Sequence, residues 1–288
     1  MQATGNPLPV KTWLITGCSG GFGRILSEAA LSRGDRVVVT ARNADSIRDF
    51  AERYPQQALA ISLDVTRTGD AAAAVAQAEK RFGGIDILVN NAGFGLVGAV
   101  EECEPAEYRP MFETNLFGLI EMTRAALPVL RRGGGGRIVN FSSIGGITGR
   151  MGVGLYNASK FAVEGLSEAL AEEVAPFGIK VIILEPGAFR TEFLGRSISV
   201  AGTEIEAYRD TSGRTRRFSE ANNGQQLGDP VRGIAVLIEA IDSDDPPLRL
   251  ALGTDAYERI RRKIARLQAE MDVWERKATS TGFEEKPV

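Results

Sequence analysis

Histidine is absent from this chain of 288 residues. Its absence excludes a Ser-His-Asp hydrolase and makes a catalytic zinc site unexpected, because both usually depend on imidazole. Cysteine occurs twice, as Cys18 and Cys103, which provide neither a disulfide framework nor the spacing of a metal site. We therefore expect no bound metal, and the two cysteines fit a reducing cytoplasm.

Long apolar runs are also missing. The longest candidate, residues 87–100, is broken by Asn90, Asn91 and three glycines, whereas a membrane helix needs roughly 20 apolar residues. The first nine residues lack a basic start followed by an apolar run, so no signal peptide is expected. The net charge of −3 argues against a nucleic-acid partner. These features predict a soluble protein with neither a membrane nor a nucleic acid as partner.

The chain does contain an alternation of short apolar segments and helical patterns. Strands are predicted at residues 12–16, 36–40, 58–62, 85–89, 137–141, 180–184 and 248–252, and helices at residues 21–32, 44–53, 69–82, 105–131, 155–175 and 230–241. This order implies a parallel sheet with helices on both faces, doubly wound by right-handed crossovers. No change in composition marks a second domain, so one Rossmann-type α/β domain over residues 1–288 is predicted.

Two segments near the C-terminus depart from this alternation. Residues 190–229 are polar and show no clear strand, so residues 188–229 are interpreted as a substrate lid. Residues 255–278 are predicted to form an extra charged helix with an apolar stripe, made of Ile260, Ile264, Leu267, Met271 and Trp274. An interface and packing on its own subunit are equally compatible with this stripe.

The lid has an apolar beginning and a basic continuation. Its first apolar side chains are expected to share a cleft with others from the sheet, namely Phe189, Phe193, Leu194 and Ile198 with Phe94, Leu96, Ile144 and Leu155. Such walls suit an apolar ketone, aldehyde or secondary alcohol. Farther along stand Arg209, Arg214, Arg216 and Arg217. A solvated lid surface is the favoured interpretation of these arginines, and contact with an acidic substrate tail is the alternative.

A glycine pattern follows the first predicted strand and opens the first helix. It consists of Gly17, Gly21 and Gly23, with Ser19 and Phe22 between them. Glycine allows a tight turn and a close backbone approach, and the helix N-terminus favours a pyrophosphate. The loop is therefore a candidate dinucleotide site, although an ordinary glycine-rich turn is the alternative. Cys18, inside the loop, is interpreted as a small packing residue rather than a reactive thiol.

The end of the second predicted strand bears on the choice of dinucleotide. NAD-binding chains commonly carry a carboxylate there for the ribose hydroxyls, but this chain has Ala41 followed by Arg42. A guanidinium suits a 2′-phosphate, which favours NADP(H) over NAD(H). A solvated arginine is the alternative. Asp64, followed by Val65, is a candidate to hold the adenine amino group, and a plain helix-flanking aspartate is nearly as well supported.

Tyr156 and Lys160 form the most informative pair in the chain. They lie four residues apart in a predicted helix, which places both on one face. A phenol with a pKa near 10 is a poor acid–base catalyst at neutral pH, and a nearby cation lowers that pKa. Together with the glycine loop, the pair predicts a proton donor beside a hydride carrier.

Taken together, these motifs resemble those of the short-chain dehydrogenase/reductase family, over residues 11–252. The matching motifs stand in the family's order: Thr16-Gly17-x-x-x-Gly21-x-Gly23, Asn90-Asn91-Ala92-Gly93, Asn115, Ser143, Tyr156-x-x-x-Lys160, and Pro186-Gly187 with Thr191. The resemblance implies a nicotinamide-dependent oxidoreductase with a Ser-Tyr-Lys-Asn catalytic group. It also implies that helices 105–131 and 155–175 form a dimer bundle, so a homodimer or homotetramer is expected.

The resemblance also implies a role for each catalytic residue. Tyr156 resembles the general acid in reduction, and Lys160 the residue that lowers its pKa and binds the nicotinamide ribose. The family's spacing selects Ser143 rather than Ser142 to donate to the substrate oxygen as charge develops there. Asn115 resembles the residue that orients a water near Lys160.

Two further segments are implied to bind the cofactor. Asn91, Ala92 and Gly93 resemble the turn on the adenosine side, and Pro186, Gly187, Phe189 and Thr191 the segment that binds the carboxamide. Phe189 stands where the family commonly has Val or Ile, so a different pocket shape beside the nicotinamide is expected.

These features lead to an NADP(H)-dependent carbonyl reductase or alcohol dehydrogenase. Alternatives in the same class are a 3-oxoacyl thioester reductase and a hydroxysteroid dehydrogenase, because the lid sets the choice. A non-catalytic NADP-binding regulator is a different class, and the complete catalytic group argues against it. Sugar-nucleotide epimerases usually need a larger C-terminal domain than this chain provides.

Overall fold

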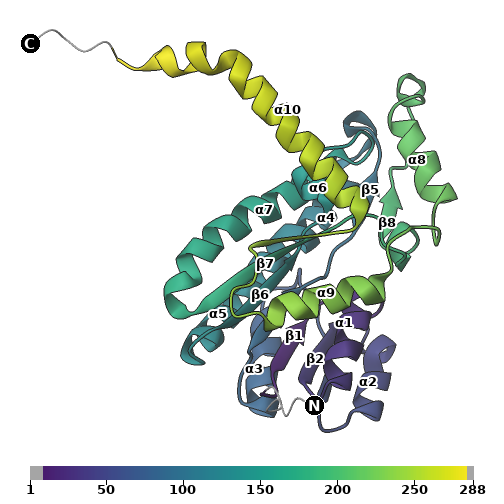
Figure 1. Cartoon of the computed structure of the whole chain (residues 1–288). Helices are drawn as coiled ribbons and strands as arrows, with labels where there is room; N and C mark the ends of the chain where they lie inside the picture. The colour runs from purple at the N-terminus through teal and green to yellow at the C-terminus, as the bar shows by residue number, and fades with distance from the viewer. Residues whose placement is uncertain (1–8, 284–288) are drawn as a thin grey trace, which may run out of the picture.

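A computed structural model describes residues 9–283 of the chain (Figure 1). The first eight residues, which include most of the segment in which no signal peptide is expected, lie outside the described residues. The same holds for the last five residues of the predicted domain.

A seven-stranded parallel sheet forms the centre of the molecule, in the order β3-β2-β1-β4-β6-β7-β9. Its strands are β1 (Thr12–Ile15), β2 (Arg36–Ala41), β3 (Ala58–Ser62), β4 (Ile87–Asn90), β6 (Gly136–Phe141), β7 (Ile179–Pro186) and β9 (Arg249–Leu252). The strand order reverses between β1 and β4, which is where doubly wound sheets bind ligands. The predicted fold class is confirmed, and strand boundaries differ from prediction by a few residues.

Helices cover both faces of this sheet (Figure 1). One face carries α1 (Gly21–Ser32), α2 (Arg48–Arg53), which follows the short 3-10 helix η1 (Ala44–Ile47), and α9 (Pro230–Asp242); the other carries α3 (Asp70–Phe82), α5 (Leu119–Arg132) and α7 (Gly154–Val174). Trp13 and Ile15 pack with the first group and Leu14 with the second. Since successive side chains of a strand point to opposite faces, a strand covered on both sides must be apolar throughout.

The helix predicted at residues 105–131 contains a π-helical segment. It consists of α4 (Pro105–Phe112), a π-helical segment η3 (Glu113–Gly118) and α5, with the 3-10 helix η2 (Val100–Glu102) before it. The predicted long helix is therefore confirmed, with a π-helical turn inside it. A side-chain carbon at Gly118 would lie 2.5 Å from Cγ2 of Val65, so the segment packs too closely for a larger residue. The π-helical turn places Asn115 in the interior, 1% exposed.

The segment predicted to lack a strand contains one. Within residues 190–229, β8 (Ile198–Val200) pairs in parallel with β5 (Gly95–Val97), and the segment also forms η5 (Glu192–Leu194), η6 (Glu206–Tyr208) and α8 (Ser212–Ala221). The sequence prediction was wrong here because three residues are too few to show a periodicity. In Figure 1, α8 stands beside β5 and β8, away from the main sheet.

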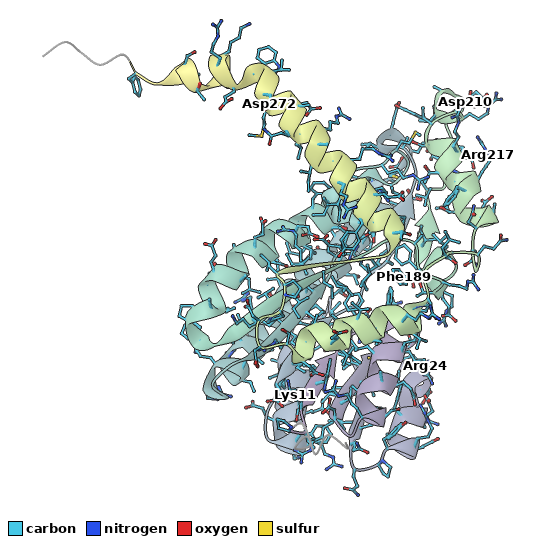
Figure 2. The ribbon with its side chains drawn as sticks, viewed as in Figure 1. Lys11, Arg24, Phe189, Asp210, Arg217 and Asp272 are labelled. Carbon is cyan, nitrogen blue, oxygen red and sulfur yellow. The ribbon has the colours of Figure 1, made fainter. Side chains whose placement is uncertain are left out.

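The four lid arginines do not share one environment. Arg209, Arg214 and Arg217 are exposed, and Figure 2 shows Arg217 pointing outward from α8. Arg216 is buried, with 8% of its surface exposed. It donates hydrogen bonds to the backbone oxygens of Ala201 and Thr203. Neither a solvated surface nor a substrate contact therefore describes Arg216.

The last helix, α10 (Thr254–Ala278), contacts the rest of the chain mainly through its first turns, against β9 and the short helix α6 (Ile144–Ile147). Beyond these turns it extends away from the body (Figure 1). Ile264 is 59% exposed and Trp274 60% exposed. Of the two interpretations of the apolar stripe, packing on its own subunit is wrong for this half of the helix. Across residues 9–283, no helix is both long and apolar enough to cross a membrane.

Candidate active site

The glycine loop joins β1 to α1 at the switch point of the sheet. Gly17 and Gly21 have φ angles of +73° and +55°, which side chains of other residues rarely adopt. A side-chain carbon at Gly23 would overlap Nδ2 of Asn91 and lie 2.5 Å from the carbonyl oxygen of Gly17. The three glycines are therefore required by the shape of the turn itself.

The turn after β4 holds this loop in place. Asn91 Nδ2 donates to the backbone oxygens of Thr16, at 2.8 Å, and Gly17, at 3.0 Å. In return, Thr16 Oγ1 accepts hydrogen bonds from the backbone N–H groups of Asn91 and Ala92, each at 3.0 Å. Asn91 thus braces the glycine loop directly. Asn90, by contrast, is buried and donates to Asn140 Oδ1 at 2.9 Å, which links β4 to β6.

The other loop residues have distinct surroundings. Ser19 is exposed, and the Phe22 ring lies 5.8 Å from the Phe141 ring and 5.2 Å from the Phe189 ring. Cys18 is fully buried, and burial raises the pKa of its thiol to about 11. Such a thiol carries almost no thiolate at neutral pH, as expected of a packing residue.

Arg42 and Asp64 stand at the carboxyl ends of β2 and β3. Arg42 is exposed, and no ion pair joins it to any residue in the described range 9–283. Asp64 Oδ1 accepts hydrogen bonds from Thr66 Oγ1, at 2.7 Å, and from Thr66 N, at 3.0 Å. These bonds lower the pKa of Asp64. Asp64 therefore shapes its own turn, and an adenine contact remains a prediction.

Tyr156 lies near the start of α7 with 9% of its surface exposed. Burial raises the pKa of its phenol to about 12, against a lowering by the hydrogen-bonded Ser143 hydroxyl. Apolar neighbours surround the phenol, including the Phe193 ring at 5.8 Å between centroids. A protonated phenol at neutral pH suits a general acid.

Lys160, which was expected to lower the tyrosine pKa, is buried on the same helix. Its Nζ donates to the backbone oxygen of Phe141 at 2.7 Å. Burial lowers the pKa of its ammonium to about 8, against a raising by Glu164. Burial is the largest cause of the shift in the pKa of Tyr156 and the Ser143 hydroxyl follows, so a lowering of that pKa by Lys160 stays a prediction.

Ser143, and not Ser142, is brought together with Tyr156. Ser143 begins α6, where its Oγ accepts a hydrogen bond from the Gly145 N–H at 2.9 Å. A side-chain carbon at Gly145 would lie 3.3 Å from Ser143 Oγ and 3.4 Å from Cε1 of Tyr156. Ser142 is buried beside Glu164. The choice that the resemblance implied between the two serines agrees with this geometry.

Both the oxygen and the nitrogen of the Asn115 side-chain amide form hydrogen bonds within the protein. Its Oδ1 accepts from Phe94 N at 2.9 Å, and its Nδ2 donates to Phe94 O at 2.9 Å and Ser159 Oγ at 3.1 Å. A side-chain carbon at Gly93 would lie 2.9 Å from Asn115 Oδ1 and 3.5 Å from Lys160 Nζ. Asn115 and Lys160 thus meet at Gly93, while a water between them remains a prediction.

The loop after β7 carries Pro186, Gly187, Phe189 and Thr191. Thr191 Oγ1 accepts from Phe193 N at 3.3 Å. Phe189 was expected to line the substrate cleft. Its ring instead packs into the core between α1 and α9 (Figure 2). Gly228 and Gly233 make room for it, because side-chain carbons there would lie 2.7 Å and 2.9 Å from the ring.

The remaining apolar wall is partly assembled as predicted. Four of its expected members gather in one cluster with Tyr156, namely Phe94, Leu96, Leu155 and Phe193. Sequence reasoning missed Asp255, which accepts a hydrogen bond from Ala188 N at 2.9 Å. A local motif could not reveal this contact, since the two residues are distant in sequence. Within the described part of the chain, no cluster of three or more Cys, Asp or Glu side chains is suited to a metal ion.

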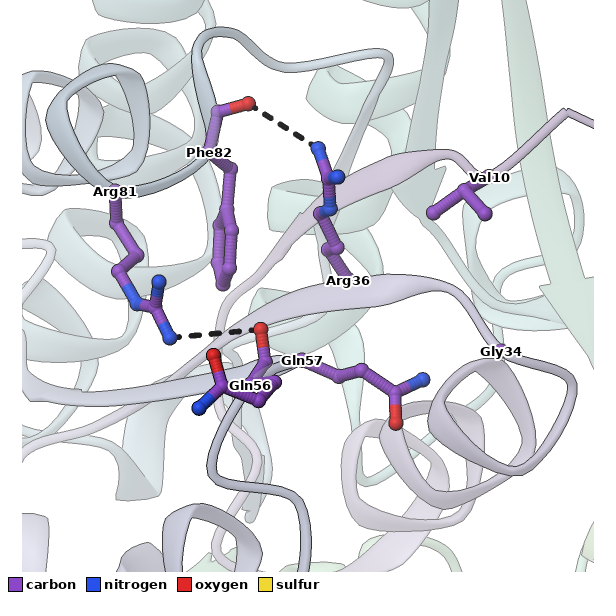
Figure 3. A pocket seen from close by; sticks show the side chains of 7 residues that line it. All are labelled: Val10, Gly34, Arg36, Gln56, Gln57, Arg81 and Phe82. Atoms are coloured by element: carbon purple, nitrogen blue, oxygen red, sulfur yellow. Dashed lines mark hydrogen bonds between the residues drawn. The ribbon is translucent and has the colours of Figure 1, made fainter.

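A separate hollow of about 440 Å³ lies at the opposite edge of the sheet (Figure 3). Its lining consists of Val10, Gly34, Arg36, Gln56, Gln57, Arg81 and Phe82. Arg36 and Arg81 donate to backbone oxygens in its wall, including that of Phe82. The hollow contains none of the residues gathered around Tyr156.

Comparison with known proteins identifies the family. The family model described as short chain dehydrogenase matches residues 11–199. The chain is 36% identical over 265 residues to BOA17, an oxidoreductase of Botryotinia fuckeliana, covering 92% of this chain and 96% of that protein. It is 38% identical over 246 residues to 3-ketodihydrosphingosine reductase of Bacteroides thetaiotaomicron, covering 83% and 87% respectively.

A solved structure gives the same result. The crystal structure of a short-chain dehydrogenase from Streptomyces avermitilis is 44% identical, with a TM-score of 0.89, and the match covers 95% of this chain and 100% of that one. The chain therefore belongs to the short-chain dehydrogenase/reductase family, as its motifs predicted. It is an oxidoreductase of that family with a Rossmann-type fold.

Proposed function

We propose that this protein transfers a hydride between NADP(H) and an apolar carbonyl or secondary alcohol. The observation that carries the proposal is the meeting of Ser143 and Tyr156 in an apolar cluster, with Lys160 buried behind them. The dinucleotide, when bound at the glycine loop, supplies or accepts the hydride. The rest of the chemistry is proton transfer and charge stabilisation by the chain.

In reduction, Tyr156 gives its proton to the carbonyl oxygen. Its phenol is protonated at neutral pH, because burial holds its pKa near 12. Ser143 donates a hydrogen bond to the same oxygen, which stabilises the negative charge that develops there. General acid catalysis by one placed group contributes about 10²–10⁴-fold. Lys160, a buried cation with a lowered pKa, stabilises the tyrosinate left after the transfer.

The preference for NADP(H) is part of the proposal and rests on Ala41 and Arg42. Arg42 is exposed at the carboxyl end of β2, where its guanidinium is available for a 2′-phosphate. Ala41 brings no carboxylate to repel that phosphate. NAD(H) use is the alternative, and Asp64, Val65 and the loop residues serve either dinucleotide.

The apolar cluster around Tyr156 supports an apolar substrate, with residues 188–229 as its lid. One relative is named a 3-ketodihydrosphingosine reductase, and we extend this only to the reacting group, a ketone beside an apolar chain. A 3-oxoacyl thioester or a hydroxysteroid also fits that description. A non-catalytic regulator is disfavoured because it would not need Ser143 and Tyr156 together.

We also propose a cytoplasmic homodimer or homotetramer. Phe161 on α7 and Phe117 on η3 are 44% and 49% exposed, and these are the elements that form the dimer bundle in the family. Gel filtration with light scattering would give the mass, and a monomer at micromolar concentration would contradict this part.

Turnover is the decisive test of the proposed function. The purified protein should oxidise NADPH in the presence of 3-oxoacyl thioesters, long-chain ketones, aromatic aldehydes or 3-oxosteroids, followed by absorbance at 340 nm. The reverse reaction is measured with the matching alcohols and NADP⁺. Binding of the dinucleotide without turnover across this panel would favour the regulator instead.

A further inference from the structure

The first turn of α10 is attached to the loop that follows β7. Asp255 Oδ2 accepts a hydrogen bond from the backbone N–H of Ala188 at 2.9 Å. The approach is so close that a side-chain carbon at Gly187 would overlap both carboxylate oxygens of Asp255. Glycine at position 187 is therefore what allows the carboxylate to reach Ala188.

The start of α10 is shaped to place this carboxylate. Gly253, which precedes the helix, has a φ angle of +96°, and a side-chain carbon there would lie 2.8 Å from Asp255 Oδ1. Asp255 stands in the first turn, where the helix N-terminus favours a negative charge. Gly187 and Gly253 thus leave room for the Asp255 carboxylate, and the helix N-terminus stabilises its charge, so that it can accept the hydrogen bond from Ala188 N–H.

The neighbouring backbone groups are held as well. Gly228 donates from its N–H to Ala188 O at 3.0 Å, and its own oxygen accepts from Arg190 N at 2.8 Å. Phe189 lies between Ala188 and Arg190, and its N–H donates no hydrogen bond to any of residues 9–283. The Phe189 N–H and the Ala188 carbonyl belong to one trans peptide plane, so they point in opposite directions. Because Gly228 N–H holds the Ala188 oxygen, the Phe189 N–H is directed away from Gly228.

A second contact extends the same arrangement to the catalytic serine. Arg259, one turn after Asp255, donates to Thr148 Oγ1 at 2.6 Å and to Thr148 O at 3.4 Å. Thr148 ends the short helix that Ser143 begins. The first two turns of α10 therefore contact both the loop after β7 and the segment that carries Ser143.

We propose that Asp255 is a positioning residue for the nicotinamide end of the dinucleotide. It acts through the loop: by holding Ala188 N–H, it fixes the direction of the free Phe189 N–H, which is the donor available to the carboxamide oxygen. The inference rests on the proposed function, since it assumes that a nicotinamide dinucleotide binds here. It gives α10 a role in cofactor binding, although α10 lies outside all of the catalytic motifs.

The test compares two ligands that differ only in the nicotinamide. NADPH and 2′-phospho-ADP-ribose are titrated against wild type, Asp255→Ala and Asp255→Asn by isothermal calorimetry. Glu258→Ala is the matched control, because Glu258 is an exposed carboxylate on the same helix. Asp255→Ala should weaken NADPH binding about tenfold, the loss expected for a hydrogen bond to a charged group. Binding of 2′-phospho-ADP-ribose should stay within about twofold of wild type, since it lacks the positioned group.

Asp255→Asn keeps an acceptor oxygen in the same place, so it should retain NADPH binding to within about threefold. Hydrogen exchange at residues 186–190 should become faster in Asp255→Ala and remain unchanged in Glu258→Ala. If Asp255→Ala is too unstable to study, Gly187→Ala replaces it, because the added carbon displaces the carboxylate from Ala188 and should produce the same selective loss.

Equal weakening of both ligands would show that Asp255 only stabilises the fold, and would overturn the proposal. Unchanged NADPH affinity in Asp255→Ala would also overturn it while leaving the proposed function intact. Wild type that binds neither NADPH nor NADH would instead contradict the proposed function itself, and the positioning role with it.

Discussion

Arg216 and Glu102 form a buried ion pair between the proposed lid, residues 188–229, and the body of the protein. Arg216 Nη2 lies 3.2 Å from Glu102 Oε2, although 114 residues separate them in the chain. Burial opposes ionisation of Glu102, but the amides of Ile205 and Ala99 and then Arg216 outweigh it and lower the pKa of this carboxyl. Because nearly every polar atom of the pair is engaged, the pair holds residues 201–216 against the segment after β5.

Loss of this pair should loosen the lid. Arg216→Leu leaves Glu102 buried without its cation, a change that typically costs about 3–5 kcal/mol. We expect faster hydrogen exchange in residues 196–221 and a lower Tm, with the sheet strands still protected. Arg217→Leu is the matched control, since Arg217 is exposed on the same helix. Equal protection of the segment in both variants would contradict an anchoring role.

Removal of the Tyr156 hydroxyl should abolish most turnover and spare cofactor binding. Tyr156→Phe keeps the ring and its packing on Phe193 but deletes the proton that the substrate oxygen receives. We expect kcat to fall at least about 100-fold, the lower range for a lost general acid. NADPH affinity, measured by fluorescence titration, should change little. A variant within a few-fold of wild type in kcat would remove Tyr156 as the acid.

Arg42 should account for most of the preference for NADPH. A hydrogen bond between charged groups is worth about 1.5–3 kcal/mol, so Arg42→Ala should lower the ratio of kcat/KM for NADPH to that for NADH by about tenfold to a hundredfold. Ala41→Asp should move the ratio further toward NADH by repelling the 2′-phosphate. The comparison uses steady-state rates with both cofactors. The assignment fails if wild type favours NADH, or if Arg42→Ala leaves the ratio unchanged.

Glu185 should make stability depend on pH. It is 1% exposed, and burial, followed by the charge of Glu164, raises its pKa to about 7 against the opposing effect of Arg249. Its Oε1 lies 3.3 Å from Arg249 Nε, and Glu168 is 2.7 Å from Arg249 Nη2. The folded state thus retains a proton that the unfolded chain loses above pH 4.5. This contribution to stability is complete below pH 4.5 and is lost as pH rises to about 7.

The unfolding free energy of wild type should therefore fall across that range by up to about 3 kcal/mol more than that of Glu185→Gln, at about 1.4 kcal/mol per pKa unit. Glu168→Gln, at the exposed end of the same cluster, is the control. The measurement is urea unfolding at pH 5, 6, 7 and 8. Parallel pH profiles for wild type and Glu185→Gln would show that Glu185 is ionised in the fold.

The sequence by itself determined the parallel sheet and the placement of Tyr156 and Lys160 on one helix. Strands buried on both faces must be continuously apolar, so β1 and its neighbours are visible as short apolar runs between helical patterns. Gly17, Gly21 and Gly23 are fixed by local backbone geometry, which a sequence motif records directly. Tyr156 and Lys160 lie four residues apart on one helix, so their spacing alone placed them on one face of it.

The tertiary structure decided whatever depends on contacts between distant residues. The hydrogen bond from Lys160 Nζ to the Phe141 backbone oxygen and the dominant effect of burial on the Tyr156 pKa follow from packing around α7. The β5–β8 pair is too short for periodicity to show, and the burial of Arg216 depends on a partner 114 residues away. Asp255 reaches Ala188 only because β9 and α10 fold back against the end of β7. Hydrophobic patterning reports which face of a segment is buried, but not which distant polar group meets it there.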